Sequence, residues 1–362
     1  MKAGIVGLPN VGKSTLFNCL SNAKAQSANF PFCTIEPNIG VVNVPDSRLE
    51  RLESLVQPEK VVPATVEIVD IAGLVRGASK GEGLGNQFLS NIRETDAILH
   101  VLRCFDNDNI VHVDGSVNPL RDKETIDLEL QLKDLETVEK RLEKVGRAAR
   151  TGNKEAIKEQ EVLQQVQDGL SAATSVRALS IADDDRLAYV KTMQLLTDKP
   201  VLYVCNVDES SAVSGNDYVE QVRKVAAAEQ ADVLVLAVST EADINELDTY
   251  EERQLFLDDL GLTEPGAAKL IRAAYAMLNL HTYFTAGPKE VRAWTVLQGA
   301  TAPQAAGVIH TDFEKGFIRA EVISYTDYDS YESEVKVKEA GKMRVEGKDY
   351  IVQDGDVMHF RF

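Results

Sequence analysis

The sequence has no long apolar run, few cysteines and a deficit of basic residues. No apolar stretch approaches the roughly 20 residues that a membrane-spanning helix needs. The N-terminus leads directly into a predicted strand, which leaves no room for a secretory signal peptide. The four cysteines, Cys19, Cys33, Cys104 and Cys205, are scattered, and their spacing matches neither a zinc site nor a disulfide framework. We therefore expect a reduced, cytoplasmic protein that does not bind a membrane.

Acidic residues outnumber basic ones, and the net charge is −18. A surface of this charge repels phosphates, which argues against DNA binding and limits any nucleic-acid contact to a local basic face. One such face is predicted where seven basic residues are opposed only by Glu143 and Glu155, namely Lys140, Arg141, Lys144, Arg147, Arg150, Lys154 and Lys158. The alternative interpretation is a solvated helix face, which is common for charge runs.

The strongest signal is a phosphate-binding loop near the N-terminus. Residues 7–14 read GLPNVGKS and match the pattern G-x-x-x-x-G-K-[ST], between a predicted strand and a predicted helix. In such loops the backbone N–H groups and the helix N-terminus bind phosphate. The lysine, Lys13, bridges the β- and γ-phosphates, and the Ser14 hydroxyl binds Mg²⁺. We expect the nucleotide to contact Asn10, Val11, Gly12, Lys13, Ser14 and Thr15.

Short apolar segments alternate with helical patterns over much of the chain. Several of these segments are β-branched and almost entirely apolar, as expected for parallel strands buried on both faces. They span residues 2–6, 39–44, 65–70, 98–104, 201–206 and 233–238. This alternation predicts an α/β fold with a mostly parallel, doubly wound sheet.

A different pattern separates the fourth of these strands from the fifth. Apolar residues recur at three- and four-residue steps and predict a helix seam formed by Leu128, Leu132, Leu135, Val138, Leu142 and Val145. A turn at 151–153 and a second apolar series predict an antiparallel helical hairpin with the basic cluster at its tip. We therefore predict a nucleotide-binding domain at 1–120 and 198–278, an inserted helical domain at 121–197, and a small α+β domain at 279–362.

A second motif indicates which kind of nucleotide-binding protein this is. Asp70-Ile71-Ala72-Gly73 ends a β-branched strand and matches the D-x-x-G element of switch proteins. In that element the aspartate holds Mg²⁺ through water, and the glycine N–H senses the γ-phosphate. Thr34, which lies between the two motifs, is placed to give Mg²⁺ a second hydroxyl. Such loops are released when the γ-phosphate is lost, so hydrolysis becomes a conformational signal.

These switch segments resemble those of a known family. Residues 70–85 resemble the second switch of the Obg group of P-loop GTPases, and residues 29–38, NFPFCTIEPN, resemble its first switch. Within that group the whole chain is most similar to the YchF branch, the Obg-like ATPases, and residues 300–319 are especially specific to it. The resemblance implies ATPase activity and a β-grasp-like TGS domain at the C-terminus. It also implies ribosome binding, through the TGS domain and the basic hairpin tip.

The residues expected to recognise the base depart from the GTPase pattern. GTPases carry N-K-x-D after the fifth strand, where the aspartate accepts two hydrogen bonds from guanine, whereas this chain has Asn206-Val207-Asp208-Glu209. The lysine is absent and the longer glutamate displaces the carboxylate, which weakens selection of guanine. The resemblance implies ATP, with Asn206 and Val207 near the base, and we expect Ser239 to close over it. Asp208 leaves guanine binding open as the alternative.

The residue that positions the attacking water does not come from the second motif. Many switch GTPases have a glutamine directly after D-x-x-G, but Leu74 occupies that position here, so we expect slow intrinsic hydrolysis. His112 is the candidate water-positioning residue, and the family resemblance also points to a histidine in this loop. A packed structural histidine is the alternative. Asn10 is a candidate K⁺ ligand beside the phosphates.

Together these features predict a Mg²⁺-dependent ATPase that acts as a nucleotide-controlled switch, with weaker use of GTP. Two alternatives remain open. One is a GTPase of the wider Obg group. The other is a nucleotide-gated ribosome- or RNA-binding module in which hydrolysis is incidental, and Leu74 favours it.

Overall fold

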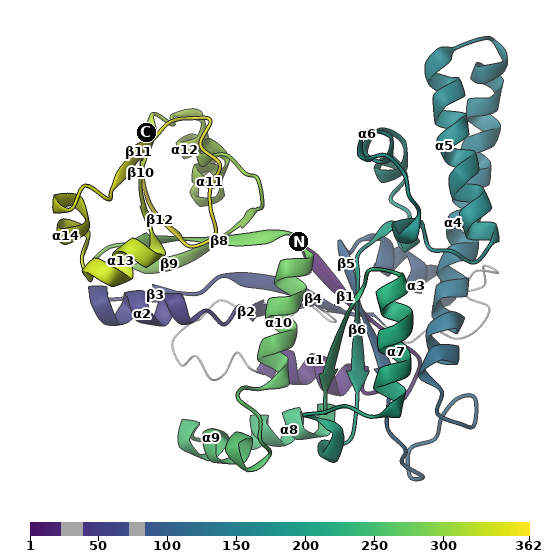
Figure 1. Cartoon of the computed structure of the whole chain (residues 1–362), viewed down its shortest axis with the longest axis horizontal. Coiled ribbons are helices and arrows are strands. Elements are labelled where there is room, and N and C mark those ends of the chain that lie inside the picture. The colour runs from purple at the N-terminus through teal and green to yellow at the C-terminus, as the bar shows by residue number, and fades with distance from the viewer. Residues whose placement is uncertain (23–38, 72–83) are drawn as a thin grey trace. The chain divides into compact units, whose positions relative to one another are not determined.

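The computed structural model describes residues 1–22, 39–71 and 84–362 (Figure 1). The described chain divides into two compact units, and both are built from discontinuous segments. The first contains residues 1–22, 39–40, 67–71 and 84–270, and the second contains 41–66 and 271–362. Thr34, Gly73, Leu74 and Cys33 lie outside the described residues. In the part of the chain that is described, no helix combines the length and the apolar character that crossing a membrane requires.

A six-stranded sheet, with parallel pairing from β4 through to β7, organises the first unit. The strand order is β2-β4-β1-β5-β6-β7, and β1 pairs in parallel with both β4 and β5, as β6 does with β5 and β7. The bounds are β1 Lys2–Val6, β2 Ile39–Asn43, β4 Thr65–Asp70, β5 Ala97–Arg103, β6 Val201–Asn206 and β7 Asp232–Leu236. All six predicted strands are confirmed to within two residues at each end. Val238, predicted to end the last strand, instead begins a helix.

Burial explains why these segments form a parallel sheet. Every residue of β5 and of β6 is buried, so both faces of these central strands must be covered. Helix α1 packs on β1, α4 on β5, and α7 on β6 and β7. The helices of this unit, apart from the segment that follows β5, are α1 Lys13–Asn22, α3 Leu84–Arg93, α7 Asp217–Ala228, α8 Val238–Glu246, α9 Tyr250–Asp259 and α10 Gly266–Met277, whose last residues belong to the second unit. This is the α/β arrangement that the sequence predicts.

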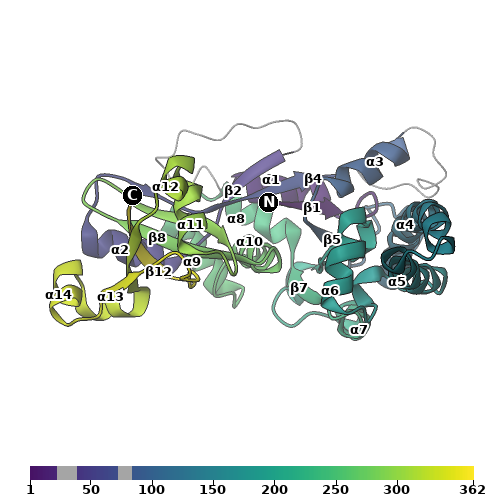
Figure 2. The same cartoon turned by 90° about the horizontal axis from the view of Figure 1, so that it is seen from above.

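Two long helices follow β5 and lie side by side (Figures 1 and 2). Helix α4 spans Pro119–Arg150 and α5 spans Lys154–Ser171. Asn118 caps the start of α4 by accepting the Arg121 N–H, and Asn153 caps the start of α5 in the same way. The short elements that lead back to β6 are η2 Val176–Ala178, α6 Asp183–Asp185, η3 Arg186–Val190, η4 Lys191–Met193 and η5 Leu196–Asp198.

The helix seam differs from the prediction in its first half. Val138 and Val145 are buried against α5, with Leu135 and Leu142 partly buried beside them. Leu128 and Leu132, however, are exposed. The first half of α4 packs on β5 and α7 instead of on α5, so it buries a different face, which includes Ile126 and Leu130.

The second unit has a mixed sheet with the order β11-β10-β12-β8-β9-β3. Strand β8 pairs antiparallel with β9 and parallel with β12, and β12 pairs antiparallel with β10. The strands are β3 Val61–Val62, β8 Leu280–Ala286, β9 Val291–Leu297, β10 Arg319–Ser324, β11 Arg344–Glu346 and β12 Asp356–Arg361. The helices are α2 Ser47–Val56, α11 Ala302–Ile309, α12 Thr311–Lys315, α13 Tyr325–Tyr331 and α14 Glu334–Glu339. Tyr283, Met358 and Phe360 are among the core residues.

An early segment of the chain forms part of this second unit. Strand β3 pairs in parallel with β9, and α2 packs on β8 and β9. Arg48, in α2, forms ion pairs of 2.7 Å with both Asp46 and Asp354. The predicted domain that begins at residue 279 did not include this segment, because nothing in residues 41–66 alone shows which sheet they join.

Candidate functional site

The phosphate-binding loop connects β1 to α1 at the carboxyl edge of the parallel sheet. Its two glycines are required by close contacts. A β-carbon on Gly7 would lie 2.6 Å from the Val101 carbonyl oxygen, and one on Gly12, whose φ is +99°, would lie 2.6 Å from Asn206 Nδ2. Helix α1 starts directly after Gly12, so its free N–H groups face the loop and can bind an anion.

Lys13 is the buried cation of this loop. Its residue is 7% exposed, and Nζ donates a hydrogen bond to the Leu8 carbonyl oxygen at 2.6 Å. Burial lowers the pKa of Lys13 to about 8, and the charge of Asp70 opposes that shift. A desolvated ammonium held in this way has few competing partners, which suits it to contact phosphate oxygens.

Ser14 and Asp70 form the candidate metal site. Strand β4 ends at Asp70, which pairs with Ile5 of β1, two residues before the loop begins. The Ser14 hydroxyl donates to Asp70 Oδ2 at 3.4 Å, and no described group hydrogen-bonds to the buried Oδ1. Burial raises the pKa of Asp70, and Lys13 and Ser14 oppose the shift. A buried carboxylate oxygen without a partner, beside a hydroxyl, is a donor set that Mg²⁺ prefers. Thr34 and Gly73, predicted to complete this site, lie outside the described residues.

The side chain of Asn206 forms hydrogen bonds within the protein. Its Nδ2 donates to the Val11 carbonyl oxygen at 2.9 Å, and its Oδ1 accepts the Val238 N–H at 3.0 Å. Asn206 therefore joins the phosphate-binding loop to the start of α8. One N–H and one oxygen lone pair of the amide remain beyond these two bonds, so the place of Asn206 near the base stays a prediction. Val207 follows it, buried, with its N–H bonded to the Leu236 carbonyl.

The acidic residues after Asn206 form a local turn. Asp208 Oδ1 accepts from the Ser211 N–H at 2.9 Å and from the Ser210 hydroxyl at 2.7 Å, so it caps the short helix η6, Glu209–Ser211. These hydrogen bonds hold the pKa of Asp208 below its usual value. Glu209 is exposed. The Asp208 oxygen that caps η6 is thus already occupied.

The segment after β7 contains one exposed and one structural residue. Ser239 is exposed at the start of α8, and its place near the base stays a prediction. Glu241, two residues on, is buried, and its carboxylate accepts the N–H groups of Gly266 and Ala267 at 2.6 and 3.0 Å. Glu241 thus caps α10, a role that sequence analysis missed because the capped helix begins 25 residues later.

His112 lies in the loop between β5 and α4, and both of its ring nitrogens have partners. Nε2 hydrogen-bonds to Asp122 Oδ2 at 2.8 Å, and Nδ1 accepts the Asp114 N–H at 3.1 Å. Asn10 of the phosphate-binding loop donates to the Val111 carbonyl at 3.1 Å, so the His112 loop contacts that loop directly. Asp122 was missed by sequence analysis. Its only signal is a position in the first turn of α4, and a helix start does not show that the preceding loop folds back onto it.

Arg103 holds the same loop through hydrogen bonds, and sequence analysis also missed this role. Its residue is 2% exposed, and its guanidinium donates to the carbonyl oxygens of Phe105, Asn107 and Ile110 at 3.2, 3.0 and 2.9 Å. From the sequence alone, an arginine at the end of a buried strand is usually expected to lie at the surface. Here the guanidinium instead joins three carbonyl oxygens of one loop.

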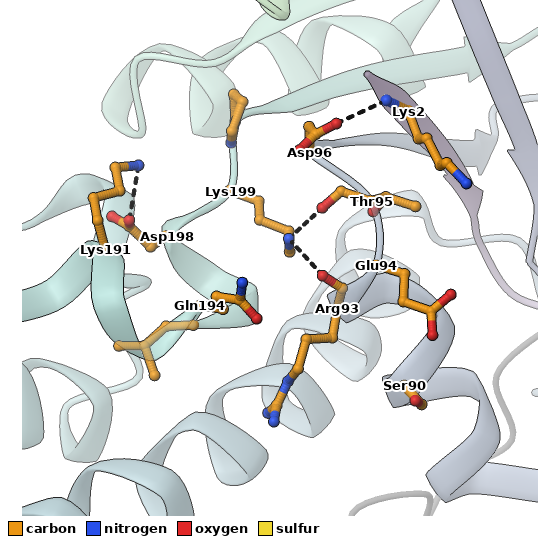
Figure 3. Close-up of a pocket in the computed structure, with 12 residues that line it drawn as sticks. Lys2, Ser90, Arg93, Glu94, Thr95, Asp96, Lys191, Gln194, Asp198 and Lys199 are labelled. Atoms are coloured by element: carbon orange, nitrogen blue, oxygen red, sulfur yellow. Dashed lines mark hydrogen bonds and ion pairs between the residues drawn. The ribbon is translucent and has the colours of Figure 1, made fainter.

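A hollow of about 670 Å³ lies at the opposite, amino edge of the sheet (Figure 3). Lys199 occupies its centre, where Nζ donates to the carbonyl oxygens of Arg93 and Thr95 and so caps the end of α3. Lys191 pairs with Asp198 at 2.9 Å on one side. These contacts lie at the starts of the strands, whereas the phosphate-binding loop lies at their carboxyl ends.

A smaller hollow of about 360 Å³ shares Arg93 and is strongly basic. We call it the basic hollow. It is lined by Arg93, Lys133, Glu136, Thr137, Lys140, Arg141, Lys144 and Met193. Lys133 and Lys140 both pair with Glu136, and Arg141 pairs with Glu159. Part of the predicted basic cluster therefore faces this hollow, whereas Arg147, Arg150 and Lys154 are exposed near the tip of the α4–α5 hairpin.

The loop, its buried lysine and the aspartate that ends the neighbouring strand define a P-loop nucleoside triphosphate-binding protein. A family model described as a 50S ribosome-binding GTPase matches residues 2–142, and the model of the C-terminal region of YchF GTPases, described as a protein of unknown function, matches residues 280–362. The chain belongs to the YchF family.

Its relatives match it from end to end. The Ribosome-binding ATPase YchF of Escherichia coli O157:H7 is 58% identical over 361 residues, covering 100% of this chain and 99% of the relative. The protein of the same name from Bacillus subtilis strain 168 is 54% identical over 364 residues with the same coverage. The solved structure of the Schizosaccharomyces pombe YchF GTPase has a TM-score of 0.90 at 38% identity and covers 100% of this chain and 97% of its own.

Proposed function

We propose that this protein is a Mg²⁺-dependent ATPase that acts as a nucleotide-controlled switch on the ribosome. The observation that carries the proposal is the arrangement of Lys13, Ser14 and Asp70 around the phosphate-binding loop. The relatives that match the full chain are named ribosome-binding ATPases. The P-loop supports nucleotide hydrolysis, and the names support ATP and the ribosome as substrate and partner.

Each residue of the site has a proposed task. Lys13 contacts the β- and γ-phosphates, and Ser14, Thr34 and Asp70, the last through water, hold Mg²⁺. When bound, the ion neutralises charge that develops on the phosphates. Gly73 senses the γ-phosphate, and His112 positions the attacking water in place of the glutamine that Leu74 replaces. Asn10 is the proposed K⁺ ligand, and comparing hydrolysis in K⁺ with hydrolysis in Na⁺ tests it.

The preference for ATP rests on the turn after β6. Asp208 caps η6 through Oδ1, and the longer Glu209 occupies the position of the guanine-binding aspartate. The bidentate pair that selects guanine therefore lacks a dedicated carboxylate. Asn206 also shapes the loop, and Asn206, Val207 and Ser239 are the proposed neighbours of the base.

Side-by-side affinities test this choice. ATP and GTP should be titrated into the same preparation in Mg²⁺, with Lys13→Ala as the control that binds neither tightly. We expect ATP to bind more tightly and to be hydrolysed faster. GTP binding at least tenfold tighter than ATP would instead support a GTPase of the wider Obg group.

Ribosome binding is assigned to the basic hairpin and to the C-terminal unit, for which we propose a TGS domain of β-grasp-like fold. The exposed basic residues near the hairpin tip can release counterions on binding RNA. Arg147, Arg150 and Lys154 reversed together to Glu should weaken co-sedimentation with ribosomes, and the difference from the wild type should shrink as the salt concentration rises. Lys158→Glu is the matched control, because Lys158 already pairs with Asp185 at 2.5 Å. Equal sedimentation of all three proteins would leave the tip as a solvated face.

One observation favours the second candidate, a nucleotide-gated binding module. Both ring nitrogens of His112 are occupied, which is consistent with very slow turnover. His112→Ala separates the two functions. If this variant still binds ribosomes only with ATP and releases them at the wild-type rate, hydrolysis is incidental. If it binds and is not released, the switch requires turnover.

A further inference from the structure

A hydrogen bond of 2.8 Å joins His112, the candidate water-positioning residue, to Asp122. We propose that Asp122 is a positioning residue that sets the basal rate of hydrolysis by latching His112 in this orientation. We call this hydrogen bond the latch. The inference rests on the proposed role of His112 and goes beyond it, because it assigns control of the rate to a second residue.

The latch leaves no ring nitrogen available. Nε2 carries the proton that the Asp122 carboxylate accepts at 2.8 Å, and Nδ1 accepts the Asp114 N–H at 3.1 Å. These two bonds fix the tautomer and the plane of the imidazole. An imidazole positions a water only through a free nitrogen, so one of the two bonds must break before His112 can act.

Both partners of the latch are buried. The His112 side chain is 4% exposed and that of Asp122 is 1% exposed. A hydrogen bond to a buried carboxylate is among the stronger kinds, because water does not compete for it. Opening the latch therefore costs enough to slow turnover.

The backbone around His112 is held independently of the latch. Arg103 binds three carbonyl oxygens of the loop, Asn10 binds the Val111 carbonyl, and the Gly115 N–H donates to the His112 carbonyl at 3.0 Å. With the backbone fixed, release is a rotation of the His112 side chain. Since Asn10 belongs to the phosphate-binding loop, the loop that carries the histidine is already in contact with the nucleotide site.

Asp122 does not lose all its partners when His112 leaves. Arg121 Nη2 lies 3.2 Å from Asp122 Oδ1, so the carboxylate keeps an ion pair. A latch that leaves neither an unpaired buried charge nor a strained backbone behind can open reversibly. Asp122 also lies in the first turns of α4, the helix that carries the proposed ribosome-binding residues, so a partner that moves the start of α4 would move the latch.

A metal site does not explain this cluster. His112, Asp114 and Asp122 have ligand atoms within 4.8 Å of one another. However, Arg121 pairs with both carboxylates, at 3.6 Å to Asp114 and 3.2 Å to Asp122. The guanidinium already supplies the positive charge that a cation would bring.

Steady-state hydrolysis of ATP by the full-length protein, without ribosomes, tests the latch. Asp122→Ala should raise kcat about three- to tenfold and leave KM for ATP unchanged. Asp122→Asn should give a smaller rise, since the amide oxygen still accepts from Nε2 but carries no charge. The double variant His112→Ala, Asp122→Ala should be as slow as His112→Ala alone.

A matched control separates the latch from general loss of stability. Asp134 is a fully buried carboxylate on the same helix that accepts the N–H groups of Leu196 and Thr197 at 2.8 and 2.7 Å. Asp134→Asn should lower the Tm and leave kcat unchanged. If Asp122→Ala lowers kcat to the level of His112→Ala, Asp122 orients an active histidine and the latch is overturned. An unchanged kcat in both Asp122 variants overturns it as well.

A spectroscopic measurement gives a readout that a structural role would not move. The chain has five histidines, so the imidazole ¹⁵N signals of His112 can be assigned by comparison with His112→Gln. The wild type should show the Nε2–H tautomer, and Asp122→Ala should show tautomers in exchange. If His112→Ala hydrolyses ATP as fast as the wild type, the proposed role of His112 itself fails. If His112→Ala is slow while Asp122→Ala matches the wild type in rate and tautomer, only the latch fails.

Discussion

Gly12 and Asn206 approach each other so closely that a β-carbon on Gly12 would lie 2.6 Å from the Asn206 amide nitrogen. The contact joins the phosphate-binding loop at one end of the sequence to the end of β6, almost 200 residues later. Its geometry explains both residue types. Only glycine fits the loop at φ +99°, and only a short amide can donate to Val11 and accept from Val238 at once.

Asn206→Ala should weaken ATP binding about tenfold and lower stability by about 1–3 kcal/mol, because it leaves the Val11 carbonyl and the Val238 N–H without partners. Isothermal titration and thermal unfolding measure the two effects. Asn245→Ala is the matched control. It removes an amide-to-carbonyl bond of 3.2 Å at the other end of α1 and should leave affinity unchanged. Equal affinities of the two variants would contradict the proposed role of Asn206.

Asp70→Asn should abolish the part of ATP affinity that depends on Mg²⁺. The wild type should bind ATP at least about tenfold more tightly in Mg²⁺ than in EDTA, a difference of about 1.4 kcal/mol, and the variant should bind equally in both. Glu67→Gln changes a carboxylate on the same strand that pairs with Lys2 at 3.4 Å, so it serves as the control. A normal Mg²⁺ dependence in Asp70→Asn would place the ion elsewhere.

The buried histidine His100 should make stability fall in mild acid. Burial lowers the pKa of His100 to about 4 from 6.5, so the folded protein keeps this ring neutral while the unfolded chain takes up a proton. The contribution is complete above pH 6.5 and declines as the pH falls towards 4, by about 3 kcal/mol in total.

Urea unfolding at pH 7.5 and pH 5 tests this effect. His100→Gln should lose less stability between the two pH values than the wild type does. His310→Gln, at an exposed histidine, should behave like the wild type. If His100→Gln loses as much stability as the wild type, the acid sensitivity comes from another group.

Arg48→Ala should destabilise the second unit by about 1–3 kcal/mol. It breaks ion pairs with Asp46 and Asp354, and the Arg48 side chain is only 26% exposed. Arg51→Ala is the control, since Arg51 pairs with Asp329 but is 43% exposed, and such a pair contributes less than about 1 kcal/mol. Hydrogen exchange in β8 and β9 measures the opening of this unit. Indistinguishable exchange in the two variants would show that the Arg48 ion pairs do not stabilise this unit.

Sequence analysis predicted the strands well because a parallel sheet leaves a simple signal. β5 and β6 are mostly apolar and buried along their whole length, as expected for central strands that are covered on both faces. The phosphate-binding loop was equally predictable, because its glycines, lysine and serine are adjacent in the chain. Helix α4 was placed correctly, but Leu128 and Leu132 were assigned to the wrong face. A periodic pattern gives the period of a helix and does not name its neighbour.

The remaining features depend on contacts between distant residues, and no local pattern encodes them. Asn206 looks like a base contact in the sequence, and only the fold shows both ends of its amide in use. His112 and Asp122 are ten residues apart and meet because the loop between them turns back. Nothing in the sequence of residues 41–66 shows which sheet they join. Local propensity was sufficient for the elements and insufficient for these pairings.

The split second unit has a consequence for how the protein is made. Roughly 200 residues separate 66 from 271, so at about 5–20 residues per second α2 is synthesised about 10–40 s before β8 and β9. During that time the apolar face of α2, with Leu49 and Leu52, has no sheet to cover it. The apolar face of this helix therefore stays uncovered in the nascent chain through most of translation. A chain that stalls or is truncated before Leu280 is therefore an aggregation hazard and a natural substrate for chaperones.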